Sequence, residues 1–120
     1  FNEKPHERLL ALEAAWKGIV DIEFTTDPAS LSSVFCAHDA VQVIEEAITN
    51  AVRAAGATRI VISWEFANQG QLQLSISDNG APNPHGVSGL GSQWLDDIAF
   101  GRWSRGLIDG QTTLLVRFSE

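Results

Sequence analysis

Hydrophobic and polar residues follow each other along the chain in patterns that predict a mixed α/β domain. Between Pro5 and Gly18, apolar residues recur at helical spacing, which predicts a short amphipathic helix. Within residues 20–24, apolar residues alternate with acidic ones, which predicts a strand with one face exposed to water. Apolar residues also occupy every second position in residues 60–66 and 72–76. A turn sequence lies between these two segments, which predicts a hairpin. Residues 112–118 predict a final strand.

The segment from Asp39 to Ala55 predicts the longest helix. It contains no proline, and its apolar residues form one buried stripe: Val41, Ile44, Ile48, Val52 and Ala55. At about 100° per residue, Glu46, Asn50 and Arg53 fall within about 60° of one another on the opposite face. Taken alone, this polar line is also what a solvated helix face shows.

Glycine and proline gather between Gly80 and Gly91, which predicts a long loop inside the domain. A further helix is predicted to begin at Ser92, a good N-cap residue, and to end before Gly101. The order of elements predicts a single domain over residues 1–120. Its expected fold class is α+β, a two-layer α/β sandwich with helices on one face of the sheet.

The composition of the chain excludes some classes of binding partner. The chain has 120 residues, of which 44% are hydrophobic and 19% charged, as in globular domains. Lys and Arg number 8 against 15 Asp and Glu, giving 8 − 15 = −7, so nucleic acid is not an expected partner. No apolar run approaches the roughly 20 residues that cross a bilayer, so no membrane contact is expected of this domain. The lone Cys36 is expected in the core, and the start at Phe1 suggests a fragment of a longer protein.

Polar residues around the predicted loop suit a nucleotide. Asp78-Asn79-Gly80 follows a strand, and its carboxylate could accept a hydrogen bond from the exocyclic amine of adenine. Gly89-Leu90-Gly91 directly precedes the predicted helix at Ser92, where backbone N–H groups and the helix dipole favour phosphate. Asn50 offers a neutral oxygen and Glu46 a carboxylate, which suit Mg²⁺ held mostly by water and nucleotide oxygens.

These residues together resemble a known family. The run from Glu46 through Asn50 and Arg53 to Ile60 resembles the N box and following strand of the Bergerat-fold (GHKL) ATPases. Asp78-Asn79-Gly80 resembles the first glycine box of that family, and Gly89-Leu90-Gly91 resembles the next. Within the superfamily, the chain is most similar to the catalytic ATP-binding domain of sensor histidine kinases of the nitrate-sensor, LiaS and DesK-like group. The phrase Ala-Gly-Ala-Thr-Arg at residues 55–59 is common there.

The resemblance covers about residues 39–118 and implies a role for each matching position. It implies a mixed, mostly antiparallel sheet with ATP and Mg²⁺ as cofactors. Asn50 would coordinate Mg²⁺, and Glu46 would be the polar or general-base residue, the catalytic one, one helical turn earlier. Arg53 would contact phosphate, and Asp78 would bind the adenine amino group. The glycine boxes would close over the nucleotide; their residues are Gly80, Gly89, Leu90 and Gly91.

The resemblance implies a protein histidine kinase. It would donate the γ-phosphate to a histidine on a dimerisation hairpin outside this segment, with a response regulator as an indirect partner. His6 is not expected to be the acceptor, because one helix and one strand already fill the interval before Asn50. The expected location is cytoplasmic, including the cytoplasmic part of a membrane-anchored sensor.

Two alternatives stay open. An anti-sigma-type serine kinase has a similar domain and needs no attached hairpin. A degenerate module would keep the fold as a partner-binding regulatory platform without turnover. Two departures from the family pattern support that last hypothesis: Ala81-Pro82 after the first glycine box, and Ala54 in place of a common histidine.

Overall fold

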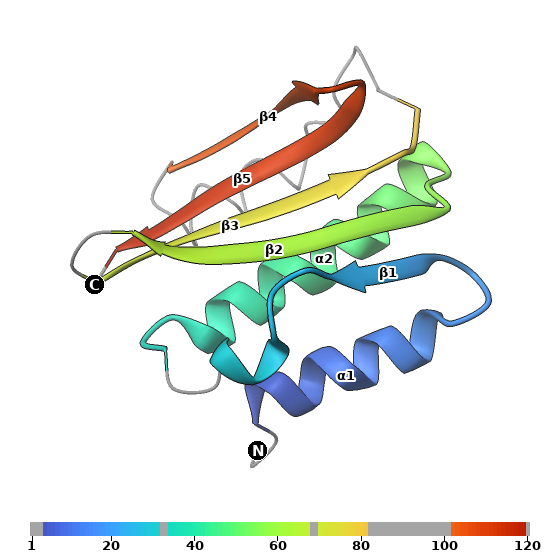
Figure 1. Ribbon diagram of the computed structural model, residues 1–120. Helices are drawn as coiled ribbons and strands as arrows, with labels where there is room; N and C mark the ends of the chain where they lie inside the picture. The colour runs from blue at the N-terminus through green and yellow to red at the C-terminus, as the bar shows by residue number, and fades with distance from the viewer. Residues whose placement is uncertain (1–3, 32–33, 68–69, 82–101, 120) are drawn as a thin grey trace.

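The computed structural model describes residues 4–31, 34–67, 70–81 and 102–119. Figure 1 shows a curved sheet with two helices on one of its faces. In chain order the elements are α1 (Pro5–Trp16), β1 (Asp21–Phe24), the 3₁₀ turn η1 (Pro28–Leu31), α2 (Ala37–Ala55), β2 (Arg59–Ala67), β3 (Gln71–Asp78), β4 (Trp103–Ile108) and β5 (Gln111–Ser119).

The sheet is mixed and mostly antiparallel, as the sequence and the resemblance predict. Its strand order is β1-β2-β3-β5-β4. β1 pairs in parallel with β2 across the connection that contains α2, and every other neighbouring pair is antiparallel. The predicted two-layer α+β architecture is therefore confirmed.

Helix α2 forms where its apolar period predicts it. Val41, Ile44 and Ile48 are buried against the sheet and α1, whereas Val52 is half-buried. The helix ends at Gly56, whose φ of 63° is left-handed and closes the last turn, with its N–H donated to the carbonyl of Val52. The predicted helix and the observed one end at the same residue.

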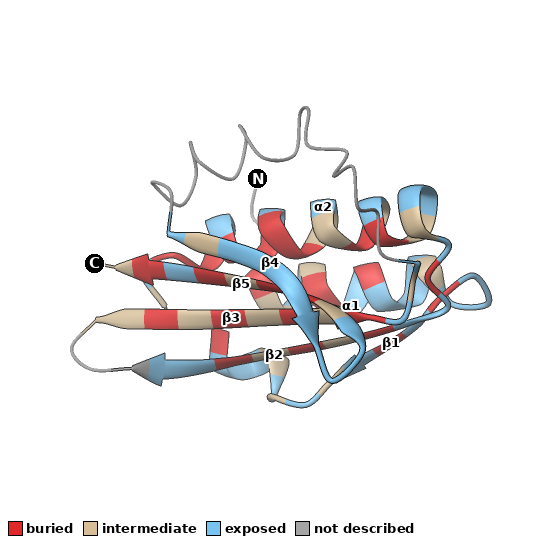
Figure 2. Ribbon diagram, turned by 90° about the horizontal axis from the view of Figure 1, so that it is seen from above, coloured by how far each residue is buried: buried red, intermediate tan, exposed pale blue. Residues whose placement is uncertain are grey.

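The core lies between the sheet and the helices. Along β3 burial alternates strictly, so that Leu72, Leu74 and Ile76 face the helices (Figure 2). Trp64 on β2 is also buried; its indole N–H donates to Ser30 Oγ. This side of the sheet is therefore apolar over most of its length.

The sequence analysis did not predict strand β4, because it places only one strand at the end of the chain. Residues Trp103–Ile108 form an edge strand paired with β5. The two strands are joined by Asp109 and Gly110 with φ of 52° and 78°, the left-handed turn that an Asp-Gly pair favours. Because all but the first of its residues are exposed, β4 lacks the alternation that identifies a strand in sequence.

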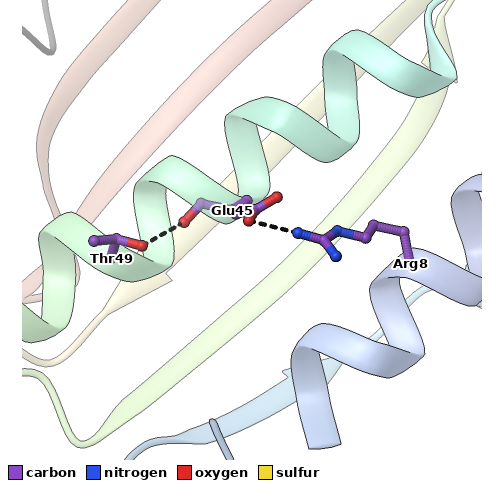
Figure 3. A network of polar contacts seen from close by, with 3 residues as sticks. All are labelled: Arg8, Glu45 and Thr49. Carbon is purple, nitrogen blue, oxygen red and sulfur yellow. Dashed lines mark hydrogen bonds and ion pairs between the residues drawn. The ribbon is translucent and has the colours of Figure 1, made fainter. Parts of the chain in front are cut away.

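Helix α1 attaches to α2 through apolar packing and one ion pair. Leu9 and Leu12 are buried in the shared core. Arg8 lies 2.7 Å from Glu45 Oε1, and Thr49 Oγ1 donates to the carbonyl of Glu45 (Figure 3). The charged side chains of this pair are 42% and 40% exposed, so water screens the pair and it adds less than about 1 kcal/mol. Apolar packing dominates this contact.

The cysteine lies in the core as expected, and its reactivity can be predicted. Cys36 is 5% exposed, and burial raises the pKa of its thiol to about 11. We expect alkylation by iodoacetamide at neutral pH to be at least about tenfold slower in the native protein than in denaturant, because only the thiolate reacts. Equal rates in the two states would show that the thiol is accessible in the folded chain.

Several predictions lie outside the described residues, namely the loop after Ala81, Gly89-Leu90-Gly91 and the helix beginning at Ser92. Within the described ranges, no helix combines the length and the apolar character that crossing a membrane requires.

Candidate nucleotide site

Asp78 is the last residue of β3, and it is buried on the helix-facing side of the sheet. Its position continues the alternation of Leu72, Leu74 and Ile76, and the side chain is 8% exposed. Burial raises the pKa of its carboxyl above the ordinary 3.8, while the N–H of Gly80 and the charge of Arg105 act in the opposite direction. A buried carboxylate with one oxygen left to accept a hydrogen bond suits an amino group on a ligand.

Gly80 holds the chain against the end of α2. Its N–H donates to Asp78 Oδ1 at 2.8 Å, and within the part of the chain that the structure describes Oδ2 is left for a ligand. A Cβ at this position would lie 2.6 Å from the Cβ of Ala55 and 2.8 Å from its carbonyl oxygen. The N–H of the next residue, Ala81, donates to that same carbonyl at 2.9 Å. The close approach therefore requires glycine and brings Asp78 next to the C-terminal turn of α2.

The polar line predicted on α2 is present in the structure. Glu46, Asn50 and Arg53 are all exposed and share one face of the helix. Asn50 lies about 140° around the helix from Glu45, the residue that faces α1, at about 100° per residue. Because α1 lies beside β1 (Figure 1), Asn50 is on the flank of α2 turned toward β5 and β4. It is five residues before Ala55, or about 7.5 Å along the helix axis.

Thr112 is a site residue that the sequence analysis missed. It is the register partner of Asp78 on the neighbouring strand β5, on the same side of the sheet as buried Leu114 and Val116. Its Oγ1 is buried and has no hydrogen-bond partner among the described residues. A hydroxyl in this state beside a carboxylate is available to a ligand. Only the pairing of β5 with β3, set by the Asp109-Gly110 hairpin, could have revealed it.

Arg105 is the second missed residue. Its neighbours in register are Leu114 on β5 and, beyond it, Ile76 on β3, so it shares the helix-facing side of the sheet with Asp78. Its guanidinium also lies 5.8 Å from the centre of the Trp103 ring. Arg105 supplies positive charge on the side of the sheet where a nucleotide would bind.

These residues suit a nucleotide with a water-rich magnesium ion better than a protein-held metal. Among the described residues, no group of three or more His, Cys, Asp or Glu is placed to hold a metal. Asn50 offers one amide oxygen on an exposed helix face, which fits an ion that takes most of its ligands from water and phosphate. The buried carboxylate of Asp78 and the Thr112 hydroxyl, which has no hydrogen-bond partner among the described residues, suit the base.

A shallow groove of about 650 Å³ lies beside α1. It is lined by the exposed side of α1, by residues 18–22 of the connection and β1, and by Thr58, and its lining contains neither Asp78 nor the polar residues of α2. The groove mixes apolar and charged side chains without a cluster of convergent polar groups. The nucleotide hypothesis does not depend on it.

Comparison of the sequence gives no match: no protein-family model matches the chain, and no curated protein does. Comparison of the structure with solved structures does give matches. The catalytic domain of histidine kinase ThkA, in a nucleotide-free form, matches with a TM-score of 0.73 and 17% identity over 96% of this chain and 90% of that one. The ATP-binding domain of PrrB from Mycobacterium tuberculosis matches with a TM-score of 0.63 and 19% identity over 96% and 90%.

A longer protein contains the same architecture as one part. The blue-light activated histidine kinase EL346 of Erythrobacter litoralis matches with a TM-score of 0.68 and 16% identity, over 93% of this chain and 39% of that one. Our chain therefore spans well under half of that protein. At these identities the similarity establishes architecture, and this chain has the fold of the ATP-binding catalytic domain of histidine kinases.

Proposed function

We propose that this domain binds Mg-ATP and serves as the catalytic domain of a two-component sensor histidine kinase. The observation that carries the proposal is the buried carboxylate of Asp78 at the end of the helix that bears Asn50. Among the described residues, one of its oxygens accepts no hydrogen bond and the neighbouring Thr112 hydroxyl has no partner. A carboxylate there accepts a hydrogen bond from the 6-amino group of adenine, in place of which guanine and the base of inosine carry a carbonyl oxygen. The shared fold with ThkA and PrrB supports the same function.

The other proposed roles follow from the polar face of α2. Asn50 would hold Mg²⁺ through its amide oxygen, and the guanidinium of Arg53, one turn later, would contact phosphate. Mg²⁺, when bound, neutralises the phosphate oxygens. This allows an acidic chain to hold a triphosphate locally. Gly89, Leu90 and Gly91 are proposed to close over the phosphates.

Phosphoryl transfer would then need little covalent chemistry from the protein. Its work is to position the γ-phosphate in line with the unprotonated nitrogen of an incoming imidazole, so that the new N–P bond replaces the bond to the departing ADP, while Glu46 accepts the proton from the other ring nitrogen. The acceptor histidine would lie on a dimerisation hairpin of the parent chain, and a response regulator would receive the phosphoryl group afterwards. One structure of the ThkA kinase contains a response regulator, TrrA. The proposed location is the cytoplasm.

We favour the kinase over the degenerate-platform alternative because the replacement at Ala81 is compatible with the proposed base site. Ala81, which departs from the family pattern, is exposed and joins the loop to α2 only through its backbone N–H, which most residue types could donate. Ala54 is exposed on α2, and its replacement of the common histidine concerns the phosphate side rather than the base. Pro82 lies outside the described residues.

Nucleotide titration with and without Mg²⁺ tests this function. We expect native protein to bind ATP at submillimolar to millimolar concentration, more tightly with Mg²⁺ present. Asn50→Ala should remove most of that Mg²⁺-dependent gain, about tenfold in affinity, because the amide oxygen is lost while an exposed helix position keeps its structure.

Gln42→Ala is the matched control, since Gln42 is an exposed amide two turns earlier on the same helix. It should bind Mg-ATP like native protein. Failure of native protein to bind ATP at millimolar concentration would refute the proposed function.

A further inference from the structure

The short segment between α2 and β2, residues 55–59, contacts the loop after Asp78 at both of its ends, through Ala55 and through Thr58 and Arg59. It contains the phrase Ala-Gly-Ala-Thr-Arg, to which the proposed nucleotide chemistry assigns no role. Gly56 ends the helix in the left-handed region, and Ala57 is buried with its N–H donated to Ala51. This geometry leaves the next two residues, Thr58 and Arg59, facing the loop that follows β3.

The side chain of Asn79 forms hydrogen bonds with both of these residues. Its Oδ1 accepts the backbone N–H groups of both Thr58, at 2.9 Å, and Arg59, at 3.0 Å. Its Nδ2 donates to Thr58 Oγ1 at 2.9 Å, and its own backbone N–H donates to the carbonyl of Arg59 at 3.2 Å. One residue therefore makes four hydrogen bonds to two consecutive residues about 20 positions away in the chain.

These bonds directly follow the predicted base-binding group and lie on both sides of Gly80. Asn79 directly follows Asp78, and two residues later the N–H of Ala81 donates to Ala55. The loop is therefore fixed before and after Gly80, against the end of the same helix that carries Asn50. The backbone at Asp78 then cannot shift relative to α2 without breaking several bonds at once.

We propose that Asn79, with Thr58 as its partner, is a positioning residue that fixes the Asp78 carboxylate for recognition of the adenine amino group. This inference rests on the proposed function, because it concerns the same nucleotide. Asn79 is exposed and neutral, so its effect on the ligand passes through the backbone of Asp78. A displacement of about 1 Å at a binding group costs up to about a hundredfold when geometry matters.

The test compares ATP with inosine triphosphate, which has the same phosphates but a carbonyl oxygen in place of the adenine amino group. Native protein should prefer ATP. Asn79→Ala should lower ATP affinity about tenfold and inosine triphosphate affinity much less, so the preference shrinks. Asn79→Asp keeps an oxygen for both N–H groups, and the Thr58 hydroxyl can donate to it, so this variant should restore the preference. Its added charge affects both triphosphates equally and cancels in the ratio.

A structural effect alone would give a different result. Asp27→Ala removes a comparable loop bond, from the N–H of Ala29 to Asp27 Oδ1 at 3.0 Å, at a turn that follows β1. It should leave the ATP preference unchanged. If Asn79→Ala fails to fold, Thr58→Val and Thr58→Ser provide the comparison: the valine should reduce the preference and the serine should keep it.

The outcomes separate the two proposals. Native protein that prefers ATP, together with an Asn79→Ala variant that keeps the full preference, overturns the positioning role and leaves the proposed function standing. Native protein with no affinity for ATP overturns both. A reduced preference in Asn79→Ala that Asn79→Asp restores supports the inference.

Discussion

Replacing Asp78 with asparagine is expected to lower ATP affinity by about a hundredfold and to turn the base preference toward inosine triphosphate. The amide keeps one oxygen for the N–H of Gly80, which donates to Asp78 Oδ1 at 2.8 Å. The remaining position becomes an NH₂ donor, which opposes the amino group of adenine but can donate to the carbonyl oxygen of inosine. The loss is large because a charged acceptor in a buried site is replaced by a second donor.

Titration of both nucleotides against native protein and Asp78→Asn measures this reversal. Glu65→Gln is a suitable control, because it removes an exposed carboxylate from β2, in register with Gln73 rather than with Asp78. It should bind both nucleotides like native protein. An Asp78→Asn variant with the native order of affinities would show that this carboxylate does not contact the base.

The same substitution is expected to stabilise the nucleotide-free domain. Burial raises the pKa of Asp78 in the folded state above the ordinary 3.8, so folding disfavours its ionised form. At neutral pH the carboxylate therefore costs folding free energy. This cost disappears as the pH falls through the folded-state pKa to 3.8, where the group is protonated in the folded state. Asparagine is neutral throughout and avoids the cost.

Denaturant unfolding of both proteins across that pH range checks the sign. Asp78→Asn should have the higher free energy of unfolding at neutral pH, and the difference should shrink toward pH 3.8. A variant that is less stable at neutral pH would mean that the charge of Arg105 and the N–H of Gly80 outweigh burial. Greater stability with weaker binding is the pattern expected of a group retained for function.

The contrast between Asp78 and Thr112 shows how far the sequence alone could go. The helix face of Asn50 and the burial phase of Asp78 were predictable, because periods of 3.6 and 2 residues are local properties of the chain. Thr112 and Arg105 enter the site only because β5 inserts between β3 and β4. That pairing joins segments that are distant in the sequence. Because β4 is mostly exposed, its sequence has no alternation of apolar and polar residues that would predict a strand there.

The contacts of Asn79 were unpredictable for a related reason. Asp-Asn-Gly is ordinary turn sequence. Its partners Thr58 and Arg59 can be identified only once the register places Ile60 opposite Asp78. The sequence motif thus located the proposed base-binding residue, whereas the register of β2 and β3 revealed the hydrogen bonds beside it.

Replacing Gly80 with alanine is expected to destabilise the domain by about 2 kcal/mol and to weaken nucleotide binding with it. The reason is space. A Cβ would lie 2.6 Å from Ala55 Cβ, 2.8 Å from Ala55 O and 2.9 Å from Asp78 Oδ1. Two of these atoms belong to the last turn of a helix and cannot rotate away. The loop must therefore move off α2, which breaks the bond from Ala81 N–H to the carbonyl of Ala55.

Gly106→Ala provides the matched control for this prediction. Gly106 lies on β4, and a Cβ there would meet nothing within 4 Å, so alanine should be neutral or slightly stabilising. Thermal unfolding and ATP titration of the two variants separate a local clash from a general effect of losing glycine. If Gly80→Ala unfolds at the temperature of Gly106→Ala and binds ATP like native protein, the loop tolerates displacement from α2. The close packing of this loop would then not be what places Asp78.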